Sequence, residues 1–313
     1  MSASAGRPFG LALALLAGVV LAGCGLGAGA APGGVQLTVT RDFGARVLHT
    51  WRAPRLAGAE TVMSLLLRNA AVATRYGGGF VQSIDGLGGG HERGTPVDWF
   101  YFVNGIEAPR GAASTNVNPG DHIWWDRHDW SQTEHIPAVV GSFPEPFLNG
   151  IAGKRLPVRV ECANVGGQAC RTVTSRLRAS GVPAAVAALG GGSAAHTLRV
   201  LVAPWSMVRG DAAVGQIENG PGASGVFARF ARDGRTLTLL DADGRPTSTL
   251  SSGAGLIAAT ASEENAPVWV VTGTDAAGVE HAAGAFDQAG LQDRFAVAVS
   301  YTGNALSSTQ VPR

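Results

Sequence analysis

The sequence lacks several features that would assign it to a function class. Its formal net charge is +1, and Lys154 is the single lysine among 24 basic residues. Such a balanced charge does not favour a polyanionic partner, so we expect no nucleic-acid binding. There is no Gly-x-Ser-x-Gly nucleophile elbow, and Gly150-Ile151-Ala152-Gly153-Lys154 lacks both the spacing and the following Ser or Thr of a phosphate-binding loop. We therefore expect no enzyme, and catalysis stays a third alternative after the two binding functions considered below.

The apolar run at the N-terminus is short. Phe9 to Leu21 is less than the length that comfortably spans a bilayer, and it ends at Leu21-Ala22-Gly23-Cys24. This tetrapeptide resembles the bacterial lipobox, which implies cleavage before Cys24 and acylation of its thiol. Two or more acyl chains anchor a protein stably in the lipid bilayer. We expect a signal peptide at 1–23 and localisation at the extracytoplasmic face of the cell membrane; the alternative is an ordinary secretory signal.

Cysteine is scarce, and its placement is informative. Besides Cys24 the chain has only Cys162 and Cys170. In an oxidising compartment, an isolated nearby pair is most simply a disulfide that closes a small loop. A catalytic thiol or a metal-binding pair is the alternative, although no third and fourth soft ligand accompanies the two cysteines.

The region from 35 to 132 carries strand patterns around one helix. Residues 24–34 are rich in Gly and Ala and predict a flexible tether. Helical spacing of apolar residues predicts a helix from Glu60 to Ala73 with Thr61 near its start. The segments with strand character are Val35–Thr40, Val47–Trp51, Phe80–Ile84, Trp99–Val103 and a strand that begins at His122. One helix lying across a mixed sheet is a β-grasp-like order.

The same region carries a family resemblance. Its motifs are Thr61-Val62 at the helix start, Ile84-Asp85-Gly86 after a glycine-flanked strand, Trp99-x-Tyr101-x-Val103-Asn104-Gly105, and Pro119-Gly120-Asp121 before Trp124. Together they resemble the family related to the C-terminal β-grasp domain of transcobalamin and intrinsic factor. The resemblance covers about Val35 to Trp130. It implies a β-grasp fold and a role next to a bound corrinoid, which is a candidate ligand here; we expect no other cofactor.

Beyond residue 132 the composition changes twice. Residues 133–156 are rich in Pro and Gly, and their apolar side chains predict an ordered linker that packs on a domain. Residues 157–301 alternate apolar strands with helices, which predicts an α/β or α+β sandwich of unrecognised family. Residues 302–313 form a tail in this interpretation. The expected fold class is therefore α+β, with a β-grasp-like domain followed by this second domain.

The aromatic hairpin from 98 to 130 holds four of the seven tryptophans. If the strand from His122 is unbroken, its period of two places His122, Trp124, Asp126 and His128 on one face. Three interpretations stay open for this face: a polar hairpin surface, a site for an organic ligand stacked on Trp124, and a divalent metal site with His122 and His128 as weak candidate ligands. The aromatic residues themselves could instead fill a core. Our candidate ligand-binding residues are Trp99, Tyr101, Trp124, Asp126 and His128.

The function we favour is non-catalytic binding of a small ligand, with a corrinoid as candidate, for delivery to an importer. The rival function is an interaction or structural module of the cell envelope. In the rival, the aromatic face docks another protein or the chain's own second half.

Overall fold

The computed structural model describes residues 1–2, 34–53, 56, 58–191, 196–262, 266–302 and 305–312. Nearly all of the predicted signal peptide and of the predicted tether, with Cys24, lies outside these residues. The fold is α+β, as predicted, and strand predominates over helix. Among the described residues, no helix is long and apolar enough to cross a membrane. Residues 32–313 form one compact unit.

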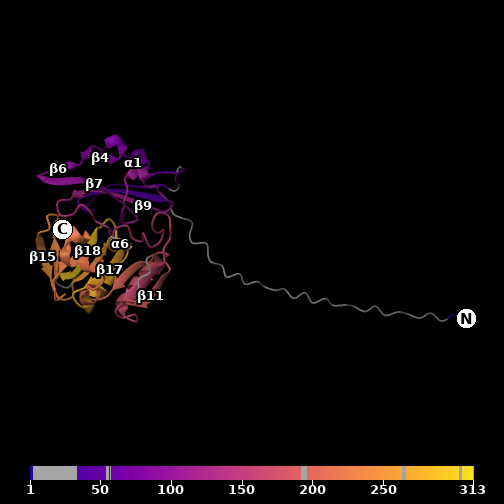
Figure 1. The fold of residues 1–313 in the computed structure, drawn as a ribbon. Coiled ribbons are helices and arrows are strands. Elements are labelled where there is room, and N and C mark those ends of the chain that lie inside the picture. The colour runs from indigo at the N-terminus through magenta and orange to yellow at the C-terminus, as the bar shows by residue number, and fades with distance from the viewer. Residues whose placement is uncertain are drawn as a thin grey trace. The chain divides into compact units, whose positions relative to one another are not determined.

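The first sheet is mixed and contains the aromatic hairpin (Figure 1). In the described residues its strand order is β2-β1-β9-β7-β6, and β8 adds to β7. β1 and β9 are parallel, and the other pairs are antiparallel. The strands are β1 (Val35–Arg41), β2 (Arg46–Ala53), β6 (Gly90–Glu92), β7 (Thr95–Val103), β8 (Ile106–Glu107) and β9 (His122–Asp129).

One helix, α1 (Val62–Asn69), covers one face of this sheet. Thr61 caps it in a reciprocal capping box with Ser64, and Leu65 and Leu66 are buried against the sheet. The helix is shorter than the predicted Glu60–Ala73, because the chain is already extended at Ala70. The next residues instead form β3 (Val72–Arg75), which pairs with β4 (Phe80–Ile84) and through it with β5 (Leu87–Gly88) in a separate small sheet. Two 3₁₀ turns, η1 (Tyr76–Gly78) and η2 (Ala112–Ser114), complete this part.

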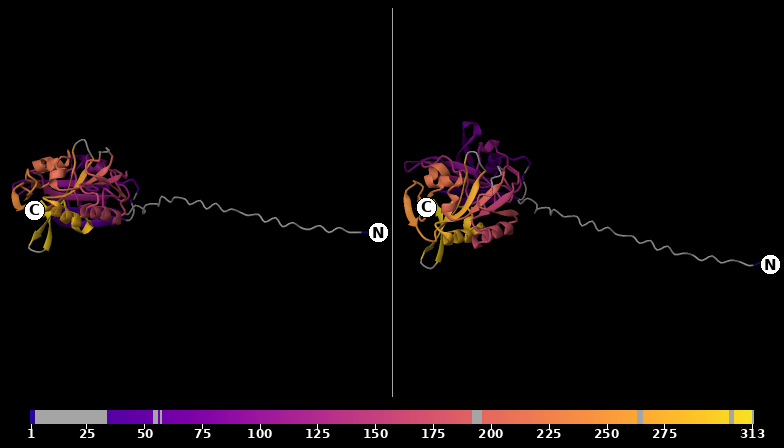
Figure 2. Two further views of the ribbon diagram at one scale, coloured as in Figure 1. Left: turned by 90° about the horizontal axis from the view of Figure 1, so that it is seen from below. Right: turned by 60° about the horizontal axis from the view of Figure 1, so that its bottom comes forward.

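The second sheet has the order β11-β10-β12-β17-β16-β18-β19 in the described residues. Figure 2 shows the ribbon from two further sides. The first four strands are parallel, and the last three add antiparallel to their neighbours. Its strands are β10 (Val158–Cys162), β11 (Ala184–Ala188), β12 (Leu198–Val202), β16 (Gly255–Thr260), β17 (Val268–Gly273), β18 (Ala296–Thr302) and β19 (Ala305–Val311). β19 lies where we predicted only a tail.

Each face of the second sheet has its own core. Helices α2 (Gln168–Ala179), α5 (Ala276–Gly284) and α6 (Gln288–Leu291) pack on one face, where Cys162 and Cys170 form the disulfide. The other face is covered by α3 (Trp205–Val208), η3 (Val214–Asn219), α4 (Pro221–Ser224) and a small sheet of β13 (Ala228–Phe230), β14 (Leu237–Leu240) and β15 (Pro246–Leu250).

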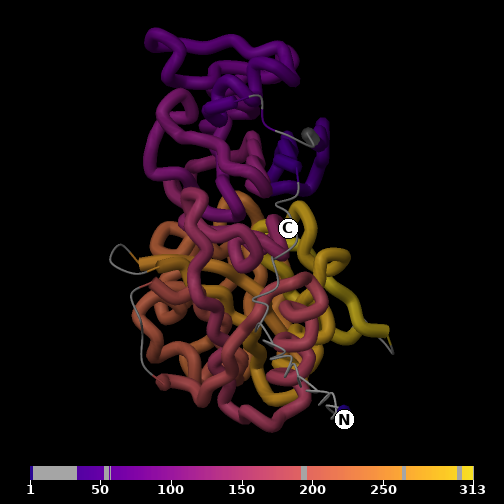
Figure 3. Tube along the Cα trace, turned by 90° about the vertical axis from the view of Figure 1, so that its right-hand side faces the viewer, coloured from indigo at the N-terminus to yellow at the C-terminus, as the bar shows by residue number. Residues whose placement is uncertain are grey.

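The core on that second face extends into the first sheet. Phe102 and Trp124 of the first sheet, with Phe43 of the turn between β1 and β2, belong to the same buried cluster as Phe227 and Phe295. Residues 133–156 lead from one sheet to the other, as the Cα trace in Figure 3 shows. Their backbone pairs with both sides, since the Val139 N–H donates to the Gly105 carbonyl and the Val140 N–H donates to the Phe295 carbonyl. This segment is therefore held by backbone hydrogen bonds to both sheets.

Candidate functional site

The five candidate ligand-binding residues lie on two opposite faces of the first sheet. In the β7–β9 pairing, Tyr101 is opposite Trp125, whereas Phe102 is opposite Trp124. Side chains directly opposite each other in an antiparallel pair share a face. Trp99 and Tyr101 thus face α1, and Trp124, Asp126 and His128 face the second half. The predicted common face of His122, Trp124, Asp126 and His128 is present, but the five residues cannot line a single site.

On the α1 side the aromatic residues serve packing and loop attachment. Trp99 is 5% exposed and donates its indole N–H to the Leu87 carbonyl at 3.0 Å. Tyr101 stacks on Trp125 with 4.8 Å between ring centroids. The Tyr101 hydroxyl donates to the Arg110 carbonyl and lies 2.8 Å from the Thr115 hydroxyl, and burial raises its pKa. Tyr101 therefore fastens the 108–115 loop to the sheet.

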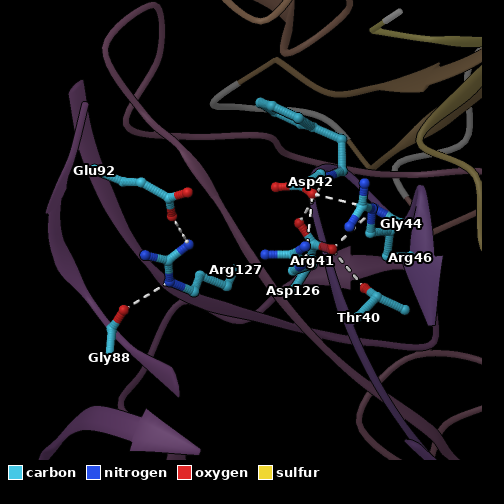
Figure 4. A network of polar contacts seen from close by, with 10 residues as sticks. Thr40, Arg41, Asp42, Gly44, Arg46, Gly88, Glu92, Asp126 and Arg127 are labelled. Atoms are coloured by element: carbon cyan, nitrogen blue, oxygen red, sulfur yellow. Dashed lines mark hydrogen bonds and ion pairs between the residues drawn. The ribbon is translucent and has the colours of Figure 1, made fainter. Parts of the chain in front are cut away.

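On the opposite side, Asp126 is fully buried and organises the β1–β2 turn (Figure 4). Its carboxylate accepts hydrogen bonds from the Phe43 N–H at 3.0 Å and the Gly44 N–H at 2.8 Å. It also accepts a 2.5 Å hydrogen bond from the Thr40 hydroxyl, and that hydroxyl in turn accepts one from the Trp124 indole at 2.7 Å. Asp126 is thus a structural carboxylate whose two oxygens are already engaged.

His128 is enclosed by aromatic rings. It stacks between Phe43 and Phe100, with centroid distances of 4.6 and 4.5 Å, and its Nδ1 lies 2.8 Å from Asp126 Oδ1. We call the following set the aromatic joint, because it connects the first sheet to the second half: Phe43, Phe102, Trp124, His128, Phe227 and Phe295. We predicted a ligand-binding surface here, but the side chains are closed inside the protein by the chain's own second half. The physical reason is that both faces of this sheet are covered.

The weak metal candidates are too far apart to share an ion. His122 and His128 are six residues apart on one strand, roughly 20 Å at the usual rise per residue. His122 is buried with its Nε2 2.9 Å from the Thr38 hydroxyl, and burial together with Arg52 lowers its pKa to about 4. Within the described part of the chain, no group of three His, Cys, Asp or Glu side chains could hold a metal ion.

A pocket of about 300 Å³ lies at the end of the first sheet, where β7 ends and β9 begins. The Asn104-Gly105 turn, with both residues at positive φ, directs the chain into β8. Ile106 of β8 then bridges to Ala138, and the chain returns through η2 to a bridge between Asn116 and Thr61. The pocket is lined by Val103, Ile106, Glu107, Ala108, Pro109, Arg110, Ser114, Thr115, Asn116, Asn118, Ile151 and Ala152.

The lining combines apolar walls with a few converging polar groups. Val103, Ile106 and Ile151 supply aliphatic surface, whereas hydroxyl, amide and guanidinium groups come from the 110–118 loop. Glu107 is the acidic group of the pocket. Its pKa is raised by burial and partly lowered again by His135, whose Nδ1 lies 3.4 Å from the carboxylate. Sequence reasoning missed this site because it joins segments more than thirty residues apart.

A buried polar cluster holds residues 150–152 against the pocket. The Asn104 side chain donates to Asp121 at 2.8 Å and to the Gly150 carbonyl at 2.9 Å. Glu145 accepts a 2.8 Å hydrogen bond from the Asn149 N–H, and the Asn149 side chain reaches the Gly120 carbonyl at 3.1 Å. Burial raises the pKa of Glu145 to about 7, and the nearby Asp121 acts in the same direction. These contacts fix the far wall of the pocket.

Comparison with known proteins relates part of the chain to a family. Residues 59–129 match the model described as Domain of unknown function (DUF4430). The chain contains a DUF4430 domain. This domain lies within the predicted 35–132 domain, and all the pocket-lining residues belong to it except Ile151 and Ala152.

Two further comparisons support no conclusion about function. A crystal structure of a proposed metal binding protein from Ruminococcus gnavus aligns with 14% sequence identity and a TM-score of 0.25. It covers 31% of this chain and 97% of that chain. At that TM-score the likeness supports no inference. No matching curated protein was found.

Proposed function

We propose that this protein is anchored by lipid at Cys24 on the extracytoplasmic face and binds a small ligand in the pocket of its DUF4430 domain. The pocket is the observation that supports binding, because a concave apolar site with a few convergent polar groups is typical of small-molecule recognition. The lipobox-like Leu21-Ala22-Gly23-Cys24 supports the anchor. The Cys162–Cys170 disulfide supports an oxidising compartment outside the cytoplasm.

The size of the pocket limits the ligand. About 300 Å³ is at the lower end of the range for ligand sites, so it suits a molecule much smaller than a corrinoid. We further propose that the first sheet with α1 is a β-grasp domain of the transcobalamin C-terminal type. On that relation a corrinoid is the candidate ligand, and it would be too large to enter the pocket as a whole. Delivery to an importer is the uptake function that would follow.

Filling the pocket is expected to weaken binding of the small ligand. Ala108 lines the pocket, and Ala108→Phe places a ring in it, so we expect at least about a tenfold loss of affinity, equivalent to about 1.4 kcal/mol. Protein isolated from its own envelope would be denatured and its released small molecules quantified by mass spectrometry. Cobinamide and cyanocobalamin would be titrated in parallel by corrin absorbance.

The matched control is Ala113→Phe, which adds the same ring to an exposed residue of η2 that does not line the pocket. Ala113→Phe should retain the wild-type amount of ligand. Equal retention in both variants would place the site elsewhere. Absence of any released molecule and of corrinoid binding would leave the interaction module as the leading function.

A further inference from the structure

The small β3-β4-β5 sheet carries an exposed aromatic tip near the pocket. Tyr76 is 86% exposed and Phe80 is 37% exposed, and they flank the Gly77-Gly78-Gly79 turn between β3 and β4. Their ring centroids are 6.3 Å apart. Tyr76 has a φ of +52°, a left-handed conformation that is unfavourable for an aromatic residue. Residues in such sparsely populated backbone conformations cluster at functional sites.

Several contacts place this tip at the N-terminal end of β1. A β-carbon placed on Gly111 would lie 3.7 Å from the Gly79 carbonyl oxygen, so the tip is next to the 108–115 loop. That loop follows β7, whose last residue Val103 pairs with Ile123 near the start of β9. Because β1 and β9 are parallel and in register, with Gln36 opposite His122, the chain enters the first sheet at this same end.

The length of the chain before β1 limits how far this end of the protein can lie from the bilayer. Gly34 is ten positions after Cys24, and a chain of ten residue steps spans at most about 35 Å. If Cys24 carries lipid, as proposed above, the start of β1 cannot leave the vicinity of the bilayer. This end also carries positive charge that suits an anionic bilayer surface, since Arg52, Arg75 and Arg110 are exposed. The acidic side chains Glu60, Asp121 and Glu145 at this end are buried, and Glu107 of the pocket is half-buried.

We propose that this end of the protein is a membrane-contacting surface that lies on anionic phospholipid. Tyr76 and Phe80 enter the headgroup region, where aromatic side chains are favoured, and the three arginines pair with lipid phosphates. The inference rests on the proposed lipid anchor and adds an orientation to it.

The test uses the full-length mature protein with one reporter thiol. Because Cys24 is acylated in this account and Cys162 and Cys170 are bonded to each other, Thr74→Cys supplies the single free thiol beside the tip. An environment-sensitive fluorophore on residue 74 should brighten about twofold or more on vesicles of phosphatidylglycerol and phosphatidylcholine, and lipid-borne nitroxide should quench it. The control is Met207→Cys on α3, 52% exposed in the second half, which should not respond.

Two double variants test which side chains cause the fluorescence response. Tyr76→Ser with Phe80→Ser should abolish the response at residue 74, as should Arg52→Glu with Arg75→Glu. Vesicles of phosphatidylcholine alone should give a weaker response. Flotation of the protein with vesicles and mass spectrometry of the peptide that begins at Cys24 report the anchor separately.

The outcomes distinguish the two proposals. A protein that floats and carries acylated Cys24, while its label at residue 74 stays in water, would overturn the membrane-contacting surface and leave the anchor intact. A response that needs an added envelope protein instead of anionic lipid would overturn it in favour of a protein partner. An unacylated chain that does not float would overturn the anchor and the orientation together.

Discussion

Replacing Asp126 with alanine is expected to lower the free energy of unfolding by about 4 kcal/mol or more. The change removes the shared acceptor of the Thr40 hydroxyl, the Phe43 and Gly44 N–H groups and the His128 ring. All of these lie in the buried joint, where each donor left without an acceptor costs about 1–3 kcal/mol. Urea denaturation followed by tryptophan fluorescence measures the loss.

The matched control for Asp126 is Asp42→Asn. Asp42 belongs to the same turn, but its side chain is 53% exposed and its ion pairs with Arg41 and Arg46 lie at the surface. Asparagine also tolerates the positive φ of this residue. We expect a change below about 1 kcal/mol. If Asp126→Ala left stability unchanged and instead weakened ligand binding, the structural role assigned to Asp126 would be wrong.

Gly44→Ala is expected to lower the free energy of unfolding by about 3 kcal/mol or more, because it adds a β-carbon where there is no room for one. Gly44 has a φ of +82°, and its β-carbon would lie 2.0 Å from the carbonyl oxygen of Asp293 in the second half. Backbone cannot rotate away as a flexible side chain can. The substitution must therefore separate the turn from residue 293 or distort both, and either movement opens the aromatic joint.

Gly94→Ala separates conformational strain from the clash. Gly94 has a φ of +90°, and among the described residues no atom lies within 4 Å of its added β-carbon. It should cost only the strain of a left-handed alanine, about 1–2 kcal/mol. Urea denaturation of both variants gives the comparison. Equal losses would mean that Gly44 does not touch the second half in solution.

Local features of the first sheet were predictable from sequence, because they depend on short-range chemistry. The period of two correctly placed His122, Trp124, Asp126 and His128 on one face. The Asn104-Gly105 turn followed from residues that accept positive φ. The disulfide followed from two cysteines eight residues apart in an otherwise thiol-poor chain.

The burial of the sheet face that carries Trp124 and His128 was not predictable from sequence. Alternation shows which residues share a face, but it does not show what packs on it. The residues that close the aromatic joint, Phe227 and Phe295, are separated from Trp124 by more than a hundred positions. The pocket was missed for a similar reason, since Ile151 and Ala152 meet Ile106 only through the path of the 133–156 segment. Candidate ligand residues chosen for aromatic content were therefore mostly core residues.

The central claim is that the aromatic joint is internal, so that ligand recognition must occur elsewhere on the first sheet. Hydroxyl-radical footprinting, with each tryptophan quantified by mass spectrometry, tests it in the unmodified protein. Trp51 and Trp130 are partly exposed, whereas Trp124 is 0% exposed. We expect Trp51 and Trp130 to oxidise about ten times faster than Trp124, with Trp99 and Trp125 also protected. Oxidation of Trp124 at the rate of Trp130 would contradict the account and restore the aromatic face as the ligand-binding surface.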